Sequence, residues 1–483
     1  MNNKYVKTKL ILLLNTLTIS FLIAQDYPII HTGVTEYSGS TSSISKPSKS
    51  DSFYGQDADY LNNIANYTDN GNGTITDNIT GLMWQKDPGE KMTFPDCFTN
   101  ANSSTLGGHS DWRVPTIKEL FSLIMFYGWE NTSQETSTPF IDTSYFIQPY
   151  GDVSAGERFI DAQTWSATEY VGTTMNNDAT VFGVNFVDGR IKGYPKYKPG
   201  TGESVFQTMH CRLVRGNSNY GINNLKNNND GTISDLATGL MWQQADDGTA
   251  RNWEEALAYA VNLDLAGYDD WRLPNIKELQ SIVDYTRSPQ TTNSPAIDAM
   301  FSCTEINDPD GNPGQYPHYW SGTTHKTGKQ EFSNAAYIAF GEAQGKPNTK
   351  ILDVHGAGAQ RSDPKSGNIA DYPQYHGPQG DVQYVYNYVR AVRNISPSSI
   401  INKDFNAEVV LYPTQAHDYI SYELTGFKLV TNYEIYSIDG KIIANGTIDD
   451  VTGTINLGNI PKGSYFIKFN TSEISINKRF FKL

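Results

Sequence analysis

Cysteine is scarce in this sequence: 483 residues contain three, Cys97, Cys211 and Cys303. With no Cys-x-x-Cys and no paired Cys/His spacing, a structural zinc site is excluded. In an oxidising compartment two cysteines can still form a disulfide. Cys97 and Cys211 flank a segment that recurs later in the chain, so a bridge between them would close that segment on itself. Two interpretations stay open, a Cys97–Cys211 disulfide or free thiols, with Cys303 left over in the first.

Positive charge is scarce as well. There are 37 Lys and Arg against 52 Asp and Glu, a net charge of −15. Phosphate binding needs clustered cations, so nucleic acid is excluded as a partner. The acidic balance suits bound calcium, but it suits plain solubility equally well. A composition of 30 Tyr and 41 Gly with only 18% charged residues predicts strands and loops more than long helices.

Long hydrophobic runs are absent except at the start, where Lys4, Lys7 and Lys9 precede an apolar stretch at residues 10–24. This pattern predicts a signal peptide over residues 1–24, cleaved between Ala24 and Gln25. The run is too short and interrupted for a membrane span, which needs about 20 apolar residues. We therefore expect an exported protein without a transmembrane segment. Residues 25–60 are rich in Ser and Thr and predict a poorly ordered linker.

The chain repeats itself, with four pairs of matching blocks in the same order. The pairs are DNITGLMWQ and DLATGLMWQ (residues 77–85 and 235–243), DWRVPTIKELFSLI and DWRLPNIKELQSIV (111–124 and 270–283), WSATE and WSGTT (from Trp165 and Trp320), and CRLVRGN and VRAVRN (from Cys211 and Val389). The repeats are expected to form two domains, repeat 1 at residues 61–217 and repeat 2 at residues 218–395.

Each repeat opens on an Asn-Gly or Asp-Gly sequence followed by alternating Thr and Ile, which predicts a tight β-hairpin. The alternative is a calcium loop, because Asp and Asn at alternate positions beside Gly resemble oxygen-ligand loops. Its candidate ligands are Asp69 and Asp77 in repeat 1 and Asp230 and Asp235 in repeat 2. No bidentate Glu stands at the required distance. Calcium is thus the one cofactor considered, and none is required.

Helical signals follow each hairpin. Residues 252–263 predict an amphipathic helix, and a second helix follows Asn275. Asn275, and Thr116 in repeat 1, are expected to cap the second helix, with Glu278 and Glu119 completing a capping box. Strand patterns come next, including a hairpin around Asp188-Gly189. Each repeat therefore predicts an α+β domain of two helices and a small antiparallel sheet.

Together, TGLMWQ, DWRxPxIKEL, WSxT and the closing VRxVR resemble the family named for the C-terminal domain of a Legionella collagen-like adhesin, the Lcl C-terminal domain. The resemblance implies two C-type-lectin-like or formylglycine-generating-enzyme-like α+β domains and a role in surface adhesion. It also implies a disulfide between the first helix and the closing strand. In repeat 2 those places are assigned to Ala260 and Ala391, so the bridge would be absent there. The founding adhesin is associated with sulfated glycosaminoglycans, which the acidic charge of this chain disfavours.

Repeat 2 contains a segment without an equivalent in repeat 1, residues 341–383, here called the repeat-2 excursion. It is rich in Gly, Pro, His and Asp and is expected to be a long irregular loop, a frequent place for function. Candidate ligand-binding residues are Trp320, His355, Arg361, Asp363, His376 and Asp381. Three interpretations remain: a polar network that stabilises the loop, a ligand or glycan site, or a metal or catalytic site. In the catalytic interpretation His355 is a general base oriented by Asp363.

The composition changes again after residues 396–403, a Ser/Pro linker. Residues 404–483 alternate short strands with Asp-Gly, Asn-Gly and Lys-Gly turns, which predicts a small all-β sandwich. YEIYSIDGKII, INLGNIPKGSYFIKF and the terminal KRFFKL resemble the type A sorting domain of type IX secretion. The resemblance implies recognition by the type IX machinery and an extracellular or outer-membrane location.

These observations predict an exported binding or adhesion protein, with a glycan as the candidate ligand, and not an enzyme. One alternative is a metal-dependent or His/Asp hydrolase seated in the repeat-2 excursion. Another is a structural envelope protein with no small ligand.

Overall fold

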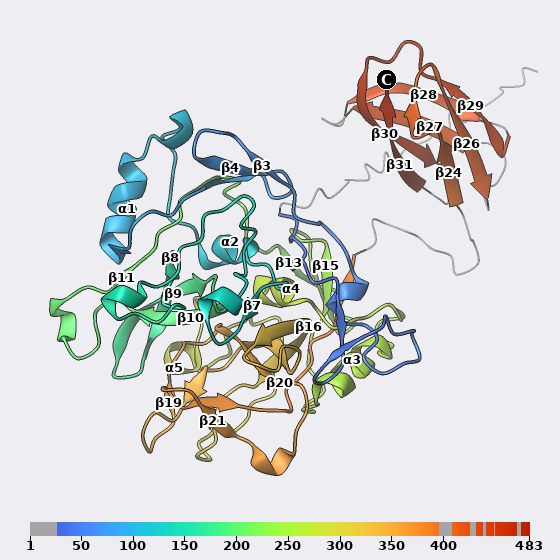
Figure 1. The fold of residues 1–483 in the computed structure, drawn as a ribbon. Coiled ribbons are helices and arrows are strands. Elements are labelled where there is room, and N and C mark those ends of the chain that lie inside the picture. The colour runs from blue at the N-terminus through green and yellow to red at the C-terminus, as the bar shows by residue number, and fades with distance from the viewer. Residues whose placement is uncertain (1–26, 396–407, 426–430, 438–440, 449, 471–474) are drawn as a thin grey trace, which may run out of the picture. The chain divides into compact units, whose positions relative to one another are not determined.

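The computed structural model describes residues 27–395, 408–425, 431–437, 441–448, 450–470 and 475–483. It divides into two compact units, residues 1–395 and 396–483 (Figure 1). The expected signal peptide, its cleavage point at Ala24 and Gln25, and the linker at 396–403 lie outside the described residues. Within those ranges, none of the helices is both long and apolar enough to cross a membrane.

The fold is predominantly β, with 36% strand and 12% helix, so the expectation of two α+β, C-type-lectin-like domains is wrong. The second helix of each repeat begins at its predicted cap, Thr116 or Asn275, but all the helices are short. They are α1 (Phe94–Ser103), α2 (Ile117–Ser122), α3 (Trp253–Val261), α4 (Ile276–Ser281) and α5 (Pro289–Thr292). Short periodic segments show that a helix exists but not how much of the chain it occupies, and the strands around these helices outweigh them.

A four-stranded sheet opens and closes each repeat. In repeat 1 its strands are β3 (Tyr67–Asp69), β4 (Thr74–Asp77), β5 (Leu82–Gln85) and β12 (Val214–Gly216). In repeat 2 they are β13 (Leu225–Asn227), β14 (Thr232–Asp235), β15 (Leu240–Gln243) and β23 (Val392–Asn394). The hairpins predicted from Asn-Gly and Asp-Gly are present, and Gly71 and Gly73 take the positive φ angles of 71° and 85° that this turn needs.

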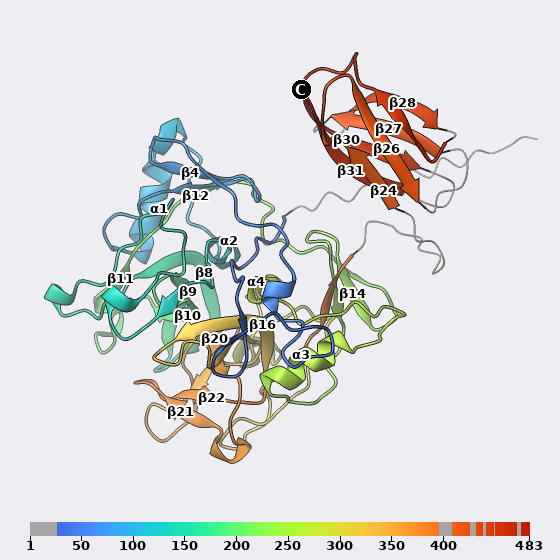
Figure 2. The same ribbon diagram turned by 45° about the vertical axis from the view of Figure 1, so that its right-hand side comes forward.

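One seven-stranded sheet runs through both repeats, in the order β7-β16-β17-β20-β10-β9-β8. Its strands are β7 (Trp129–Glu130), β8 (Gln163–Thr174), β9 (Asp178–Asn185), β10 (Arg190–Pro195), β16 (His318–Thr327), β17 (Asn334–Ala339) and β20 (Gln360–Pro364). Repeat 1 supplies four of these strands and repeat 2 three: β8, β9 and β10 mirror β16, β17 and β20, and β7 of repeat 1 pairs parallel with β16 at the edge of the sheet. At the junction, β10 pairs antiparallel with β20 at Ile191 and Gln360. Figure 2 shows β20 beside β10 at this junction. The repeats therefore share a sheet.

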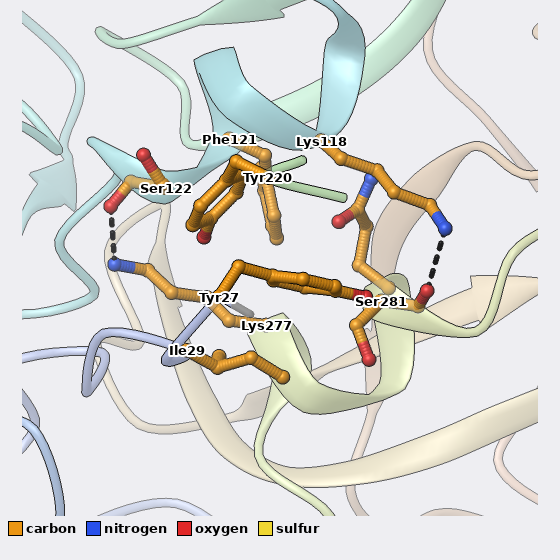
Figure 3. A pocket seen from close by; sticks show the side chains of 9 residues that line it. Tyr27, Ile29, Lys118, Phe121, Ser122, Tyr220, Lys277 and Ser281 are labelled. Carbon is orange, nitrogen blue, oxygen red and sulfur yellow. Dashed lines mark hydrogen bonds between the residues drawn. The ribbon is translucent and has the colours of Figure 1, made fainter. Parts of the chain in front are cut away.

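The helices α2 and α4 also meet across the junction (Figure 3). Lys118 of α2 donates to the carbonyl of Ser281 at the end of α4, at 2.6 Å. Lys277 of α4 donates to the carbonyl of Ser122 at the end of α2, at 2.8 Å. Each lysine thus satisfies a terminal carbonyl of the other repeat's helix. Burial lowers the pKa of Lys118 to about 8 and that of Lys277 to about 7.

Residues 27–60, here called the N-terminal strap, are not a loose linker. The carbonyl of Thr32 accepts the amide of Phe126 in repeat 1 at 2.7 Å, and the amide of Tyr27 donates to Ala237 of repeat 2 at 3.3 Å. Tyr27 is 1% exposed and packs with Ile30 in a core that contains residues of both repeats. The expectation of a poorly ordered linker is therefore wrong: the composition of the strap is polar overall, but apolar residues spaced along it, among them Tyr27, Ile30 and Ala58, are buried. Its elements are β1 (Tyr37–Ser38), β2 (Ser43–Ile44) and the 3-10 turn η1 (Asp57–Asp59).

The repeat-2 excursion is ordered: four of its short strands form a small sheet of their own, and β20 joins the seven-stranded sheet. The strands are β18 (Gln344–Gly345), β19 (Leu352–Asp353), β21 (Gln374–His376) and β22 (Asp381–Gln383), in the order β19-β18-β22-β21. Shorter elements of residues 27–395 are β6 (Met92–Thr93), β11 (Thr208–Met209), η2 (Leu106–Gly108), η3 (Gln134–Thr136), η4 (Val153–Ala155), η5 (Gly202–Ser204) and η6 (Ile369–Asp371).

The second unit consists of two sheets. One has the order β24-β26-β29 and the other β25-β31-β30-β27-β28. The strands are β24 (Glu408–Tyr412), β25 (Gln415–Ala416), β26 (Tyr419–Thr425), β27 (Thr431–Ser437), β28 (Ile442–Ile448), β29 (Thr452–Asn456), β30 (Gly463–Asn470) and β31 (Ser475–Lys482). Alternate residues of both sheets, among them Ile420, Ile435 and Phe469, are fully buried in one apolar core.

Candidate functional site

Three of the candidate residues in the repeat-2 excursion converge. His355 follows β19, Arg361 lies on β20 and Asp381 begins β22. The Nε2 atom of His355 lies 2.9 Å from Oδ1 of Asp381. The guanidinium of Arg361 contacts both His355 Nε2 and Asp381 Oδ2. Here the sequence proximity did indicate spatial proximity, because two short strands and one turn bring the three side chains together.

The charges of these three side chains, here called the triad, are balanced within it. Burial, reinforced by the charge of Arg361, lowers the pKa of His355 to about 4 and keeps the imidazole neutral at pH 7. Burial opposes the ionisation of Asp381, but the charge of Arg361 and the hydrogen bond with His355 outweigh it and lower the pKa of the carboxyl. The triad is therefore an ionised Asp381–Arg361 pair with a neutral histidine against it. The Nε2 atom of His355, both carboxylate oxygens of Asp381 and the two terminal nitrogens of Arg361 are engaged within the triad.

The other candidate residues lie elsewhere. Asp363 accepts from Asn387 at 3.0 Å and lies 3.4 Å from Nδ1 of His318, so the expected His355–Asp363 pair is replaced by His355–Asp381. His376 is exposed on β21, where it is the register partner of Asp381. Trp320 is 0% exposed, and its indole N–H donates to the carbonyl of Arg251 at 2.8 Å. Its aromatic face is part of the core.

The triad sits where the excursion holds repeat 1. The amide of Gly193 on β10 donates to the carbonyl of His355 at 2.8 Å, and the amide of Met175 donates to that of Asp353 at 2.8 Å. The hydroxyl of Tyr170 on β8 donates to Oδ2 of Asp353 at 2.7 Å. Burial, and the nearby charge of Glu342, raise the pKa of Asp353 to about 8. The excursion thus acts as a clasp between the repeats.

The four acidic residues proposed for calcium serve the hairpin turns. Asp69 pairs with Lys86 at 2.6 Å. Asp77 and Asp235 accept backbone amides just beyond β4 and β14, at 2.9 Å from Ile79 and 3.2 Å from Ala237. Asp230 accepts the amide and hydroxyl of Thr232 at 3.0 and 2.6 Å. In the part of the chain that the structure describes, no three His, Cys, Asp or Glu residues are grouped so as to hold a metal ion.

Cys97 of α1 and Cys211 lie in one buried cluster without a covalent bond between them. A hydrogen bond to Cys211, together with burial, raises the pKa of Cys97. This proximity keeps the disulfide possible in an oxidising compartment, and it stays a prediction.

The assignment of these two positions in repeat 2 to Ala260 and Ala391 is wrong. The N-caps Thr93 and Asn252 align Cys97 with Ala256. The buried arginines Arg212 and Arg390 donate to equivalent carbonyls, those of Gln85 and Gln243, at 2.8 and 2.9 Å, and they align Cys211 with Val389.

Most residues of the repeated blocks have matched structural roles. Arg113 pairs with Glu119 of the capping box, and Arg272 pairs with Glu278 at 2.6 Å. The hydroxyls of Thr168 and Thr323 in the WSxT blocks each accept the first helical amide at 3.0 Å. The sequence analysis missed the lysine of IKEL. Its recurrence beside a buried isoleucine in both copies was the available signal, because a solvent-exposed lysine has no reason to recur there.

Fold and site together define a protein of two fused β-rich repeats followed by a separate β unit. Models of the Lcl C-terminal domain match residues 73–215 and 231–355, more than half of the chain. The chain therefore belongs to the Lcl C-terminal domain family. Residues 410–482 match the secretion system C-terminal sorting domain, which directs export by the type IX system to the cell surface or outer membrane. The second family match ends at His355, so most of the clasp lies beyond it.

No curated protein matches the chain. Among solved structures, the chain is similar to PorZ, described as an essential bacterial surface component of the type-IX secretion system of Porphyromonas gingivalis. The identity is 10% and the TM-score 0.14, with 66% of this chain and 47% of that chain covered. This chain spans about half of the length of PorZ, and a likeness at this level assigns neither fold nor function.

Proposed function

We propose that this exported protein is a surface binding protein that adheres to glycans, and that it is not an enzyme. The observation that carries the proposal is the closed triad. The residues best suited to acid–base chemistry, His355, Arg361 and Asp381, are bound to one another at the joint between the repeats. A general base must reach a substrate proton, and a histidine with a pKa of about 4 is a weak base at neutral pH.

Hollows elsewhere on the first unit support binding. An open hollow of about 450 Å³ lies along α3 and is lined by Arg251, Tyr259 and Leu263. The guanidinium of Arg251 stacks on the ring of Tyr259 at 4.0 Å. A second hollow of about 320 Å³ lies between α3 and the strap around Phe53 and Tyr54. Aromatic faces beside short polar groups suit the alternating apolar and hydroxylated surfaces of sugars.

The test is a glycan array probed with the full-length exported protein, with and without calcium. Binding to a defined glycan set without any change in the mass of the glycans supports the proposal. Cleaved glycans would instead indicate a hydrolase. An empty array would leave a structural envelope role, and an array signal that disappears with chelator would restore the calcium interpretation.

A further inference from the structure

A small hollow of about 120 Å³ lies where the N-terminal strap meets both repeats. We propose that this hollow, here called the strap pocket, binds one pyranose ring of a neutral glycan. The inference rests on the proposed glycan binding and gives it a place. The pocket differs from the two hollows beside α3 because residues from three parts of the chain build it: Ser38 and Glu36 from the strap, Tyr127 from repeat 1, and Thr324, Lys326 and Phe332 from repeat 2.

The floor of the strap pocket holds a hydrogen-bond donor without an acceptor. The hydroxyl oxygens of Ser38 and Thr324 lie 2.7 Å apart, and Nζ of Lys365 donates to each of them at 2.8 Å. Only one of the two hydroxyls can donate along their mutual bond. The other hydroxyl makes no further hydrogen bond within the part of the chain that the structure describes. Both side chains are buried, 1% and 5% exposed, so an unused donor is costly unless an oxygen fills the pocket.

The walls are aromatic. Tyr127 is 41% exposed, and Phe332 packs beneath the ammonium of Lys326, whose Nζ is 5.0 Å from the ring centroid. Gly33 lets the strap lie close to Tyr127: its φ is +82°, and a Cβ there would lie 2.9 Å from Cδ1 of the tyrosine. A flat aromatic face covers the apolar face of a sugar ring, while hydroxyls at its edge reach the polar floor.

The charges at the mouth select a neutral ligand. Lys326 pairs with Glu36 at 2.7 Å and with Glu331 at 2.9 Å. A charged ligand would have to break one of these ion pairs. A polyhydroxylated ligand only exchanges hydrogen bonds with the same groups, because they offer both donors and acceptors.

Repeat 1 has no counterpart of this pocket. Alignment of WSATEYV with WSGTTHK places Glu169 and Val171 at the positions of Thr324 and Lys326. The floor hydroxyl and the mouth ammonium are therefore both missing there. Within residues 27–395 there is therefore one strap pocket, not a symmetric pair.

The experiment titrates the full-length exported protein with methyl glycosides of glucose, galactose and mannose, observed by saturation-transfer NMR. A single sugar in a small open pocket is expected to bind with a Kd on the order of 1 mM. Tyr127→Ala removes an aromatic wall at an exposed position, and we expect affinity to fall about tenfold. Thr324→Val keeps the shape but removes a floor hydroxyl, with an expected loss of about fivefold. The matched control is Tyr268→Ala. Tyr268 is also an exposed tyrosine but lies outside the pocket, where it stacks on Arg393 at 3.8 Å, and we expect its loss to leave affinity unchanged.

Each outcome decides. If the array shows glycan binding but Tyr127→Ala and Thr324→Val bind normally, the strap pocket is not the site, and the proposed function stands. If the pocket holds only water, no saturation is transferred from the protein to any of the glycosides, and this result also overturns the inference. If the array is empty as well, both proposals fail. Thermal unfolding of each variant near the parent temperature separates lost contacts from a lost fold.

Discussion

The two repeats contain the same blocks in the same order, and the structure uses them alike. Both repeats tie DWR to the second helix through an arginine–glutamate pair, and in both the WSxT threonine accepts the first amide of that helix. They differ at the third strand of the shared sheet. Repeat 1 reaches β10 by a tight turn at Asp188-Gly189, whereas repeat 2 inserts β18 and β19 before β20. Repeat 1 also keeps two cysteines in its core where repeat 2 has Ala256 and Val389.

The difference teaches that the copies have specialised for one another. Repeat 2 supplies the clasp that holds β8 and β10 of repeat 1, and it receives much of the strap. Repeat 1 supplies β8, β9 and β10 of the shared sheet. Its two buried cysteines also offer a disulfide that would stabilise its own core. An inserted segment that faces the partner repeat is more constrained than a surface loop, which accounts for its ordered strands.

The clasp is the most asymmetric feature, so breaking it should have the largest effect. Replacing Arg361 by Met leaves the carboxylate of Asp381 buried without its cation, and we expect the free energy of unfolding to fall by about 4 kcal/mol. The measurement is urea denaturation. The control Arg158→Met, in a more exposed pair with Asp161 in repeat 1, is expected to cost under about 1 kcal/mol. Equal losses would show that the triad is no clasp.

The cysteine pair of repeat 1, Cys97 and Cys211, should have the next largest effect on stability. A Cys97–Cys211 disulfide would stabilise the oxidised protein by about 3 kcal/mol relative to the reduced one. The variant with Cys97→Ala and Cys211→Val carries the residues of repeat 2, and its stability should not respond to dithiothreitol. Thiol titration of the denatured protein reports the state directly. One free thiol indicates the bridge, and three free thiols rule it out.

The reciprocal lysines test whether the joint is symmetric. Lys118 and Lys277 have pKa values of about 8 and about 7 in the folded chain, below the ordinary 10.5. A lowered pKa contributes stability above pH 10.5 that is lost as the pH falls toward the folded value. Between pH 8 and 9.5 we therefore expect the two lysines together to raise stability by about 3 kcal/mol. Lys118→Met and Lys277→Met should each flatten this rise, while Lys226→Met, at an exposed site, should not. Two unequal profiles would show that one repeat dominates the joint.

The N-caps of the second helices are the features in which the two repeats are most alike. Their loss should have the smallest effect on stability and the same effect in both repeats. Thr116→Ala and Asn275→Ala each remove an N-cap acceptor, and about 1 kcal/mol of stability is expected to go with either. The readout is the midpoint of chemical unfolding. The same shift in both variants supports one cooperative unit, and two separate transitions would show that the repeats unfold independently.

Local signals in the sequence were good guides to local structure. Asn-Gly turns, capping boxes and alternating strands all appear where the residues predicted them. The candidate site was predicted in part. His355, Arg361 and Asp381 do converge, but Asp363 joins His318 and Asn387 instead, and Trp320 is core. Strand pairing between distant segments decides such partners, and no local pattern reports it.

The sequence by itself determined that the chain is duplicated, that it carries a sorting unit, and where the opening hairpins and the helices α2, α3 and α4 begin, because turns, caps and periodicity depend on neighbouring residues. The tertiary structure decided that the repeats share one sheet, that the strap is built into their core, and that the polar excursion holds the copies together. Those features arise from burial and pairing between segments far apart in the chain. There a side chain of one segment bonds to the backbone of another, and no local pattern reports such a contact.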